Sequence, residues 1–102
     1  MIIYNITVSV EESITNDWLN WMKTEHIPQV MTCGIFTKAK IYKIITEVDT
    51  NNTFAVAYSC LTIQHLHQYQ VNFSQQLQKE HIARFGDKAV TFRTIMETIA
   101  EF

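Results

Sequence analysis

Apolar and polar residues alternate with a period of two along four segments of the chain. The clearest is residues 2–10, where one set of alternate positions is apolar and the other mostly polar. Such alternation predicts a strand with one face on a core and one face toward a more polar environment. Residues 36–47, 53–61 and 88–98 are also rich in apolar and β-branched side chains. We predict a strand in each, with a polar turn over residues 48–52 that joins the second and third into a hairpin.

A helical pattern follows the first strand. Glu11-Glu12-Ser13 places acidic residues at a helix start, where the positive end of the dipole favours them. At about 100° per residue, one apolar arc collects seven side chains, which are Ile14, Trp18, Leu19, Trp21, Met22, Glu25 and His26. An arc this wide must pack on a sheet or on another helix.

Proline and glycine predict where this helix ends. Ile27 precedes Pro28 and should be pushed out of the α region, so we expect the helix to end at about residue 25 or 26. Pro28 would then open a short extra turn over residues 28–32, and Gly34 would end it.

A second helical pattern lies between the third and fourth strands. Thr62 is a candidate N-cap, and Phe85-Gly86-Asp87 is a stop signal. One face carries Ile63, Leu66, Phe73 and Leu77, with a break near Val71-Asn72 as an alternative to one continuous helix.

The resulting order, β-α-β-β-α-β, predicts an α+β fold in a single domain over residues 1–102. Right-handed crossovers give a four-stranded antiparallel sheet of order 4-1-3-2 with both helices on one face, which is the ferredoxin-like plait. The other face of the sheet stays open. We expect it to carry Asn5, Thr7 and Ser9 with some of Phe36, Tyr42, Ile44, Ala55, Ala57 and Ile95. That mixture fits a semi-polar interface, so we predict a homodimer.

Composition narrows the class of protein. With 47% hydrophobic and 18% charged residues and a net charge of −2, the 102-residue chain is globular rather than disordered. No apolar run approaches the roughly 20 residues that span a bilayer, and the N-terminus enters a strand without a leader pattern. We therefore expect a cytoplasmic protein without membrane contact. Cys33 and Cys60 are expected to be reduced thiols rather than zinc ligands.

The tripeptide Glu-His-Ile occurs near the end of both helical patterns, at residues 25–27 and 80–82. If the two helices run roughly parallel, His26 and His81 lie near one another at the same end of the domain. Histidines at helix ends commonly cap carbonyls, because the dipole there favours a cation. A ligand-facing role and, less readily, a metal site are the alternatives.

Glu25 and His26 are the candidate catalytic pair. An unpaired carboxylate inside an apolar arc is costly to bury, so Glu25 must reach solvent, pair with a cation or be held for use. An imidazole beside it and a negative helix end should have a raised pKa, suited to acid–base work. Trp21, His81 and Arg93 are the candidate ligand-binding residues, with an interface or surface charge as the alternative for Arg93.

The order of Trp21, Glu25-His26-x-Pro28, Gly34 and Phe36 resembles the His-x-Pro signature of EthD-like members of the dimeric α+β barrel superfamily. Over its full length the chain is similar to a small uncharacterised bacterial family, DUF 4286. The resemblance implies ferredoxin-like plaits that dimerise through their open sheet faces. It also implies a histidine, here His26, that acts on a small ligand between sheet and helices. No residue of this chain can be matched to a partner acid or a haem ligand of that superfamily. The resemblance therefore leaves open whether the protein is an enzyme.

Two functions therefore compete. One is a dimeric barrel that binds or transforms a small hydrophobic metabolite, and the alternative is a non-catalytic homodimeric interaction or regulatory module. RNA binding is disfavoured, because the first strand offers Asn5 and Thr7 where stacking aromatics are needed. We expect no cofactor, no metal or haem needed for folding, and no nucleic-acid partner.

Overall fold

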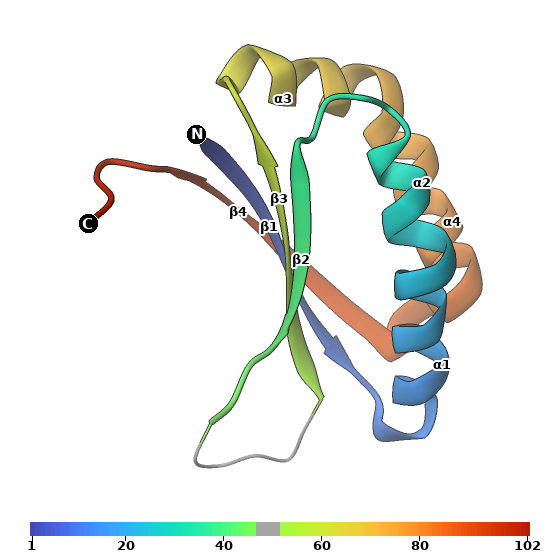
Figure 1. Ribbon diagram of the computed structural model, residues 1–102. Helices are drawn as coiled ribbons and strands as arrows, with labels where there is room; N and C mark the ends of the chain where they lie inside the picture. Colours follow the sequence, from blue (N-terminus) through green and yellow to red (C-terminus); the bar gives the residue numbers. More distant parts are fainter. Residues whose placement is uncertain (47–51) are drawn as a thin grey trace.

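A computed structural model describes residues 1–46 and 52–102 of the chain, and Figure 1 shows a layer of helices against one face of a twisted sheet. The strands are antiparallel in the order β2-β3-β1-β4. This is the predicted order 4-1-3-2 counted from the other edge, so the ferredoxin-like plait is confirmed. The strands are β1 (Ile2–Val10), β2 (Lys38–Lys43), β3 (Thr53–Cys60) and β4 (Ala89–Glu97).

The first helical column does not break at Pro28. It starts with a 3₁₀ turn and then runs without interruption to Met31. Its parts are η1 (Glu12–Ile14), α1 (Thr15–Trp21), the π segment η2 (Met22–His26) and α2 (Ile27–Met31). Ile27 keeps helical angles (φ −61°, ψ −46°), so the predicted end at residue 25 or 26 is wrong. The π segment directly before Pro28 has a wider turn, which leaves space for the proline ring. It also changes which backbone carbonyls require an N–H donor for their hydrogen bond.

The second helical column begins at the predicted N-cap. The Thr62 hydroxyl accepts a hydrogen bond from the backbone N–H of His65. The column also carries a π segment, which lies where the sequence left a break open. Its parts are α3 (Ile63–Tyr69), η3 (Gln70–Ser74), α4 (Gln75–Phe85) and a closing 3₁₀ turn, η4 (Gly86–Lys88).

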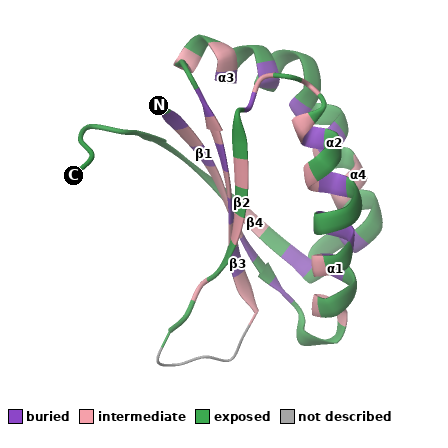
Figure 2. Ribbon diagram, in the orientation of Figure 1, coloured by how far each residue is buried: buried purple, intermediate pink, exposed green. Residues whose placement is uncertain are grey.

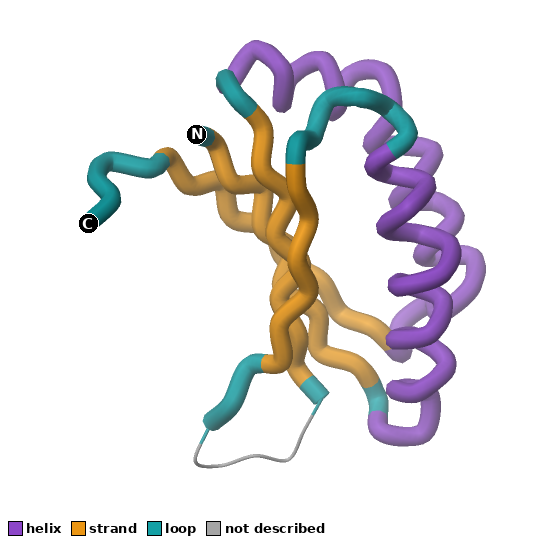
Figure 3. Tube along the Cα trace, in the orientation of Figure 1, coloured by secondary structure: helices purple, strands orange, loops and turns teal. Residues whose placement is uncertain are grey.

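The two helical columns run in opposite directions, which corrects the prediction that they are parallel. Each column returns along the strand before it, and β1 and β3 are antiparallel. Figure 1 shows the chain rising from α1 to α2 and descending from α3 to α4. Figure 3 shows the same two columns side by side over the sheet. None of the described helices is both long and apolar enough to cross a membrane.

The second strand is shorter than predicted. It begins at Lys38, and Phe36 instead lies in the preceding loop with its side chain buried in the core. Glu47 and residues 48–51 of the predicted turn lie outside the described residues. Ile95 pairs with Tyr4 and therefore shares its helix-facing side of the sheet, not the open face.

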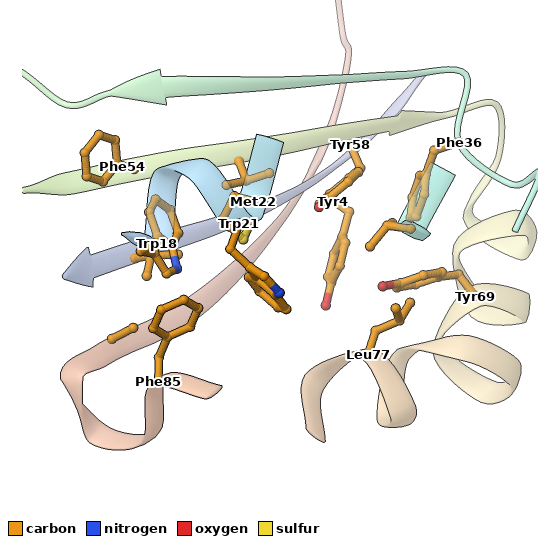
Figure 4. Close-up of a cluster of buried hydrophobic side chains, with 14 of the residues drawn as sticks. Tyr4, Trp18, Trp21, Met22, Phe36, Phe54, Tyr58, Tyr69, Leu77 and Phe85 are labelled. Carbon is orange, nitrogen blue, oxygen red and sulfur yellow. The ribbon is translucent and has the colours of Figure 1, made fainter. Parts of the chain in front are cut away.

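The core fills the space between the helices and the sheet. Figure 2 shows buried positions on the inner side of both layers, and Figure 4 shows the aromatic side chains that meet there. Trp18 packs on Phe54 with ring centroids 5.2 Å apart. At the other end, Tyr4, Phe36, Tyr58 and Tyr69 form a connected aromatic cluster.

Candidate functional site

A small cavity lies between the helices and the middle of the sheet. We call it the inner cavity; its volume is about 30 Å³, counted as the space open to the centres of water molecules. One water needs about 10–15 Å³ on this measure, so the inner cavity has room for about two waters. Its polar lining consists of Tyr4, His26, Tyr58, Tyr69, Ser74, Gln78, His81, Thr91 and Arg93.

An open depression adjoins the inner cavity at the β4 side of the sheet. This outer pocket has a volume of about 300 Å³ and is lined by Tyr4, Gln70, Ser74, Gln75, Gln78 and Arg93. Four of these residues also line the inner cavity, so they form a shared wall: Tyr4, Ser74, Gln78 and Arg93.

Two hydrogen bonds hold that shared wall together. Arg93 Nε donates to the Tyr4 hydroxyl at 2.9 Å, which joins β4 to β1. Gln78 Nε2 donates to Ser74 Oγ at 2.7 Å, which joins α4 to the π segment η3. Side chains that are hydrogen-bonded to one another therefore contribute to the wall between the two spaces.

His81 is held as a neutral imidazole. An indole N–H only donates, and Trp18 Nε1 lies 3.0 Å from His81 Nε2. Nε2 must therefore accept, which leaves the ring proton on Nδ1. Burial and the nearby Arg93 charge both lower the pKa of His81. Protonation of Nε2 would break the bond to Trp18.

His26 is also neutral, which corrects the prediction of a raised pKa. Its side chain is buried, and its ring stacks on Trp21 with centroids 4.7 Å apart. Burial and, to a smaller extent, His81 lower the pKa of His26 to about 4. Since the helix continues to Met31, His26 lies in the middle of the column and does not experience the negative helix end.

Two buried polar atoms in the lining have no hydrogen-bond partner among the described residues. They are His26 Nδ1 and the Tyr58 hydroxyl oxygen. An unpartnered buried polar group costs roughly 1–3 kcal/mol. Burial raises the pKa of Tyr58, so its hydroxyl keeps its proton. Both atoms are available to a water or a ligand in the inner cavity.

The structure brings three of the five sequence-predicted site residues together. The His26 and His81 rings have centroids 6.0 Å apart, and both line the inner cavity with Arg93. Their proximity has a different cause from the predicted one: the columns are antiparallel, and His26 lies mid-column.

The other two predicted site residues do not line the inner cavity. Trp21 is buried and supports the two histidines, with its ring centroid 4.7 Å from that of His26 and 5.9 Å from that of His81. Its ring also contacts Phe85, and Arg84 lies over it at 5.7 Å. Glu25 is exposed and is not part of the lining. A π segment holds more residues per turn than the α-helix assumed for the wheel, so Glu25 rotates out of the buried face.

Sequence reasoning missed Tyr4, Tyr58, Ser74 and Gln78 as site residues. The two tyrosines occupy alternate positions in strands, so the pattern alone places them on the apolar face of the sheet. Their hydroxyls were the available signal, because a buried tyrosine usually needs a polar partner. Ser74 and Gln78 gave no signal, since their contribution depends on the π segment.

No group of three or more metal-binding side chains gathers among residues 1–46 and 52–102. Cys33 and Cys60 are free thiols. Cys60 is buried in the core, and burial raises the pKa of its thiol. Neither cysteine lines the inner cavity.

Comparisons with known proteins agree with this architecture. The family model described as "Domain of unknown function (DUF4286)" matches residues 1–99. A comparison with curated proteins found no match. The chain is similar to a dimeric ferredoxin-like protein from an uncultured marine organism (TM-score 0.77, 8% identity, 99% of this chain and 97% of that one covered).

Two further solved structures are similar over almost the whole chain. One is a proposed antibiotic biosynthesis monooxygenase from Nitrosomonas europaea (TM-score 0.69, 13% identity, 98% of this chain and 100% of that one covered). The other is an EthD family protein from Bacillus halodurans (TM-score 0.69, 14% identity, 97% and 100% covered). At such identities the likeness shows a shared fold only.

Proposed function

Because this chain belongs to the DUF4286 family, whose description assigns no activity, we propose a function from the site itself. The protein is a homodimer that binds a small hydrophobic metabolite between its helices and its sheet. The ligand enters through the outer pocket and reaches the inner cavity by displacing the side chains of the shared wall. A reducing compartment such as the cytoplasm suits its free thiols.

The observation that carries this proposal is the pair of unpartnered polar atoms, His26 Nδ1 and the Tyr58 hydroxyl, beside an internal cavity. Buried polar groups are normally paired, and an exception marks a site for a water, an ion or a ligand. Apolar side chains such as Met22, Val30 and Leu77 complete the lining. Ligand sites are commonly apolar spaces with a few convergent polar groups of this kind.

The two histidines act as hydrogen-bonding groups rather than as an acid–base pair. With a pKa of about 4, the His26 imidazole is a weak base at neutral pH. His81 offers its Nδ1–H while Nε2 stays bonded to Trp18. The exposed Glu25 has no part in this site. Binding therefore accounts for the site better than proton transfer does.

Dimerisation is supported by the open sheet face. Its exposed apolar side chains are Tyr42, Val90, Phe92 and Met96. Two of the similar solved structures are described as dimeric ferredoxin-like proteins. A non-catalytic interaction module, the alternative function, would use this face alone, and waters in the inner cavity would then satisfy its unpartnered atoms.

The test is a ligand screen on the unmodified protein and on Tyr58→Phe. Thermal shift and NMR chemical-shift changes are recorded with small aromatic and aliphatic metabolites at millimolar concentration. We expect compounds that stabilise the parent protein to lose at least threefold in affinity for Tyr58→Phe.

The free Tyr58→Phe protein should be as stable as the parent or about 1 kcal/mol more stable, because a buried unsatisfied hydroxyl is removed. Tyr4→Phe is the comparison for stability alone, since it removes a hydroxyl that has a partner and should lower stability by about 0.5–1.5 kcal/mol. Failure of every compound to bind the parent protein would refute the proposed function.

A further inference from the structure

The residues that line the outer pocket carry a positive charge and no negative charge. The six residues comprise one cation, three amides and two hydroxyl groups, and none is acidic. The cation is Arg93, whose charge is strong enough at this position to lower the pKa of His81. A fixed positive charge at a pocket mouth, surrounded by neutral donors, favours an anionic ligand.

Among residues 1–46 and 52–102, the one side-chain hydrogen bond of Arg93 uses its Nε, and its terminal NH₂ groups have no partner. Its Nε is already bonded to the Tyr4 hydroxyl at 2.9 Å, which fixes the direction of the side chain. The two terminal NH₂ groups keep four N–H donors, the arrangement that a carboxylate accepts in bidentate form. Tyr4 accepts from Arg93, so its own hydroxyl proton remains available to the same anion.

The helical column beside the pocket supplies further side-chain donors. Gln70 and Ser74 belong to the π segment η3, and Gln75 and Gln78 follow in α4. Single π turns inside α-helices are frequent at functional sites, because they redirect side chains. Here the π segment begins at the first glutamine, Gln70, and ends directly before the other two, Gln75 and Gln78.

The single cation in the lining of the outer pocket indicates a ligand with a single negative charge. Phosphate sites usually combine several cations with free N–H groups at a helix N-terminus. At this pocket the column passes from η3 into α4 without a terminus, so its backbone offers no such group. A singly charged carboxylate matches one arginine with neutral donors.

We infer that Arg93, Tyr4 and Gln78 form a carboxylate-binding subsite, and that the ligand class is a small monocarboxylic acid with an apolar body. This inference rests on the proposed function, because the apolar body follows the path that the proposed function assigns to the ligand, from the outer pocket toward the inner cavity. A volume of about 300 Å³ is at the lower limit for ligand pockets, so the acid is small.

The test compares charged and neutral probes by calorimetric and NMR titration. Phenylacetate and hexanoate are the acids, methyl phenylacetate and phenylacetamide are the neutral analogues, and inorganic phosphate is the second anion. The variants are Arg93→Gln, Arg93→Lys and, as a matched loss of one charge away from both pockets, Arg84→Gln. Thermal unfolding verifies that each variant is folded.

We expect at least one acid to bind, with a tenfold or greater loss in Arg93→Gln, a smaller loss in Arg93→Lys and less than twofold change in Arg84→Gln. The neutral analogues should bind more weakly than the acids and be insensitive to Arg93. Neutral analogues that bind as well as the acids, with no effect of Arg93→Gln, would sink the carboxylate subsite and leave the proposed function standing. Tighter binding of phosphate than of either acid would also overturn it, whereas no binding by any probe would overturn both proposals.

Discussion

His26 and His81 illustrate how one local feature changes the chemistry of a residue. Both rings were expected near negative helix ends, which favour the imidazolium form. His26 instead lies in the middle of an unbroken column and stacks on Trp21, and His81 accepts a hydrogen bond from Trp18. Burial is therefore the main cause of both pKa shifts, and both pKa values are lowered.

These lowered pKa values predict how stability depends on pH. Between pH 6.5 and about 4 the unfolded chain binds a proton at residue 26 that the folded chain does not bind. The contribution of His26 to stability is therefore complete above pH 6.5 and is lost as the pH falls toward 4. His81 acts in the same direction. For one proton the loss approaches about 1.4 kcal/mol per pH unit.

Urea unfolding at intervals from pH 7.5 to 4.5 measures this effect. The free energy of unfolding should decrease less steeply in His26→Gln than in the parent protein. The exposed His67→Gln serves as the control, because it removes a histidine outside the inner cavity. Parallel curves for His26→Gln and the parent would show that the pKa of His26 is the same in the folded and unfolded chains, which contradicts the lowered pKa.

The limits of sequence reasoning are visible at the same scale. His26, His81 and Arg93 were identified because histidine and arginine are conspicuous residue types. Glu25 was identified because a regular wheel placed it in the apolar arc. Its actual exposure depends on the π segment, which no periodicity count anticipates. A tyrosine such as Tyr58 differs from a core phenylalanine only by its hydroxyl, so alternation alone could not assign it to a site.

At the scale of elements, both helical columns contain a π segment, and each last α-helix is followed by a glycine with positive φ. Gly86 is the C-cap of α4, and Gly34 lies three residues after the end of α2, with φ values of 57° and 77°. Both stop signals follow from the sequence, because a glycine near the end of a helical pattern adopts this backbone readily. The π segments were not predicted, apart from the break left open near Val71. A π segment rotates the side chains that follow it around the helix axis by a fraction of a turn. The apolar period of the whole column stays nearly unchanged.

Gly86 supports a specific prediction, because it closes α4 just before β4 begins. Its backbone lies at φ 57° and ψ −132°, a region close to one that only glycine occupies readily. An added Cβ would meet nothing within 4 Å, so the whole cost of Gly86→Ala is backbone strain. We expect a loss of about 1–3 kcal/mol.

Gly34→Ala is the comparison, since its Cβ also meets no neighbour. A left-handed cap position with φ 77° should cost about 1 kcal/mol on substitution, less than at Gly86. Chemical denaturation of the two variants gives both values. Equal stability of Gly86→Ala and the parent protein would contradict the strain argument.

At the scale of the whole molecule, the architecture could be read from the sequence because it depends on simple periods. Four alternating segments and two helical ones, with right-handed crossovers, leave one sheet order. The prediction of parallel helices is wrong, although the correct direction follows from that order. Because β1 and β3 are antiparallel, the helical columns that return along them must be antiparallel too. The inner cavity could not be predicted, since its volume depends on how large side chains pack across the layers.

The open sheet face supports the last prediction, which concerns assembly. Phe92 lies on this face opposite Thr7 and is 62% exposed. If the face joins two copies, a charge at Phe92 would be buried without a partner, and Phe92→Lys should convert the dimer to a monomer. Ile82→Lys is a matched control, because Ile82 is also 62% exposed but lies on helix α4. Sedimentation and light scattering at micromolar concentration should give a dimer for the parent protein and for Ile82→Lys, and a monomer for Phe92→Lys. A dimer that survives Phe92→Lys would indicate assembly through another surface, and a monomeric parent protein would exclude the homodimer.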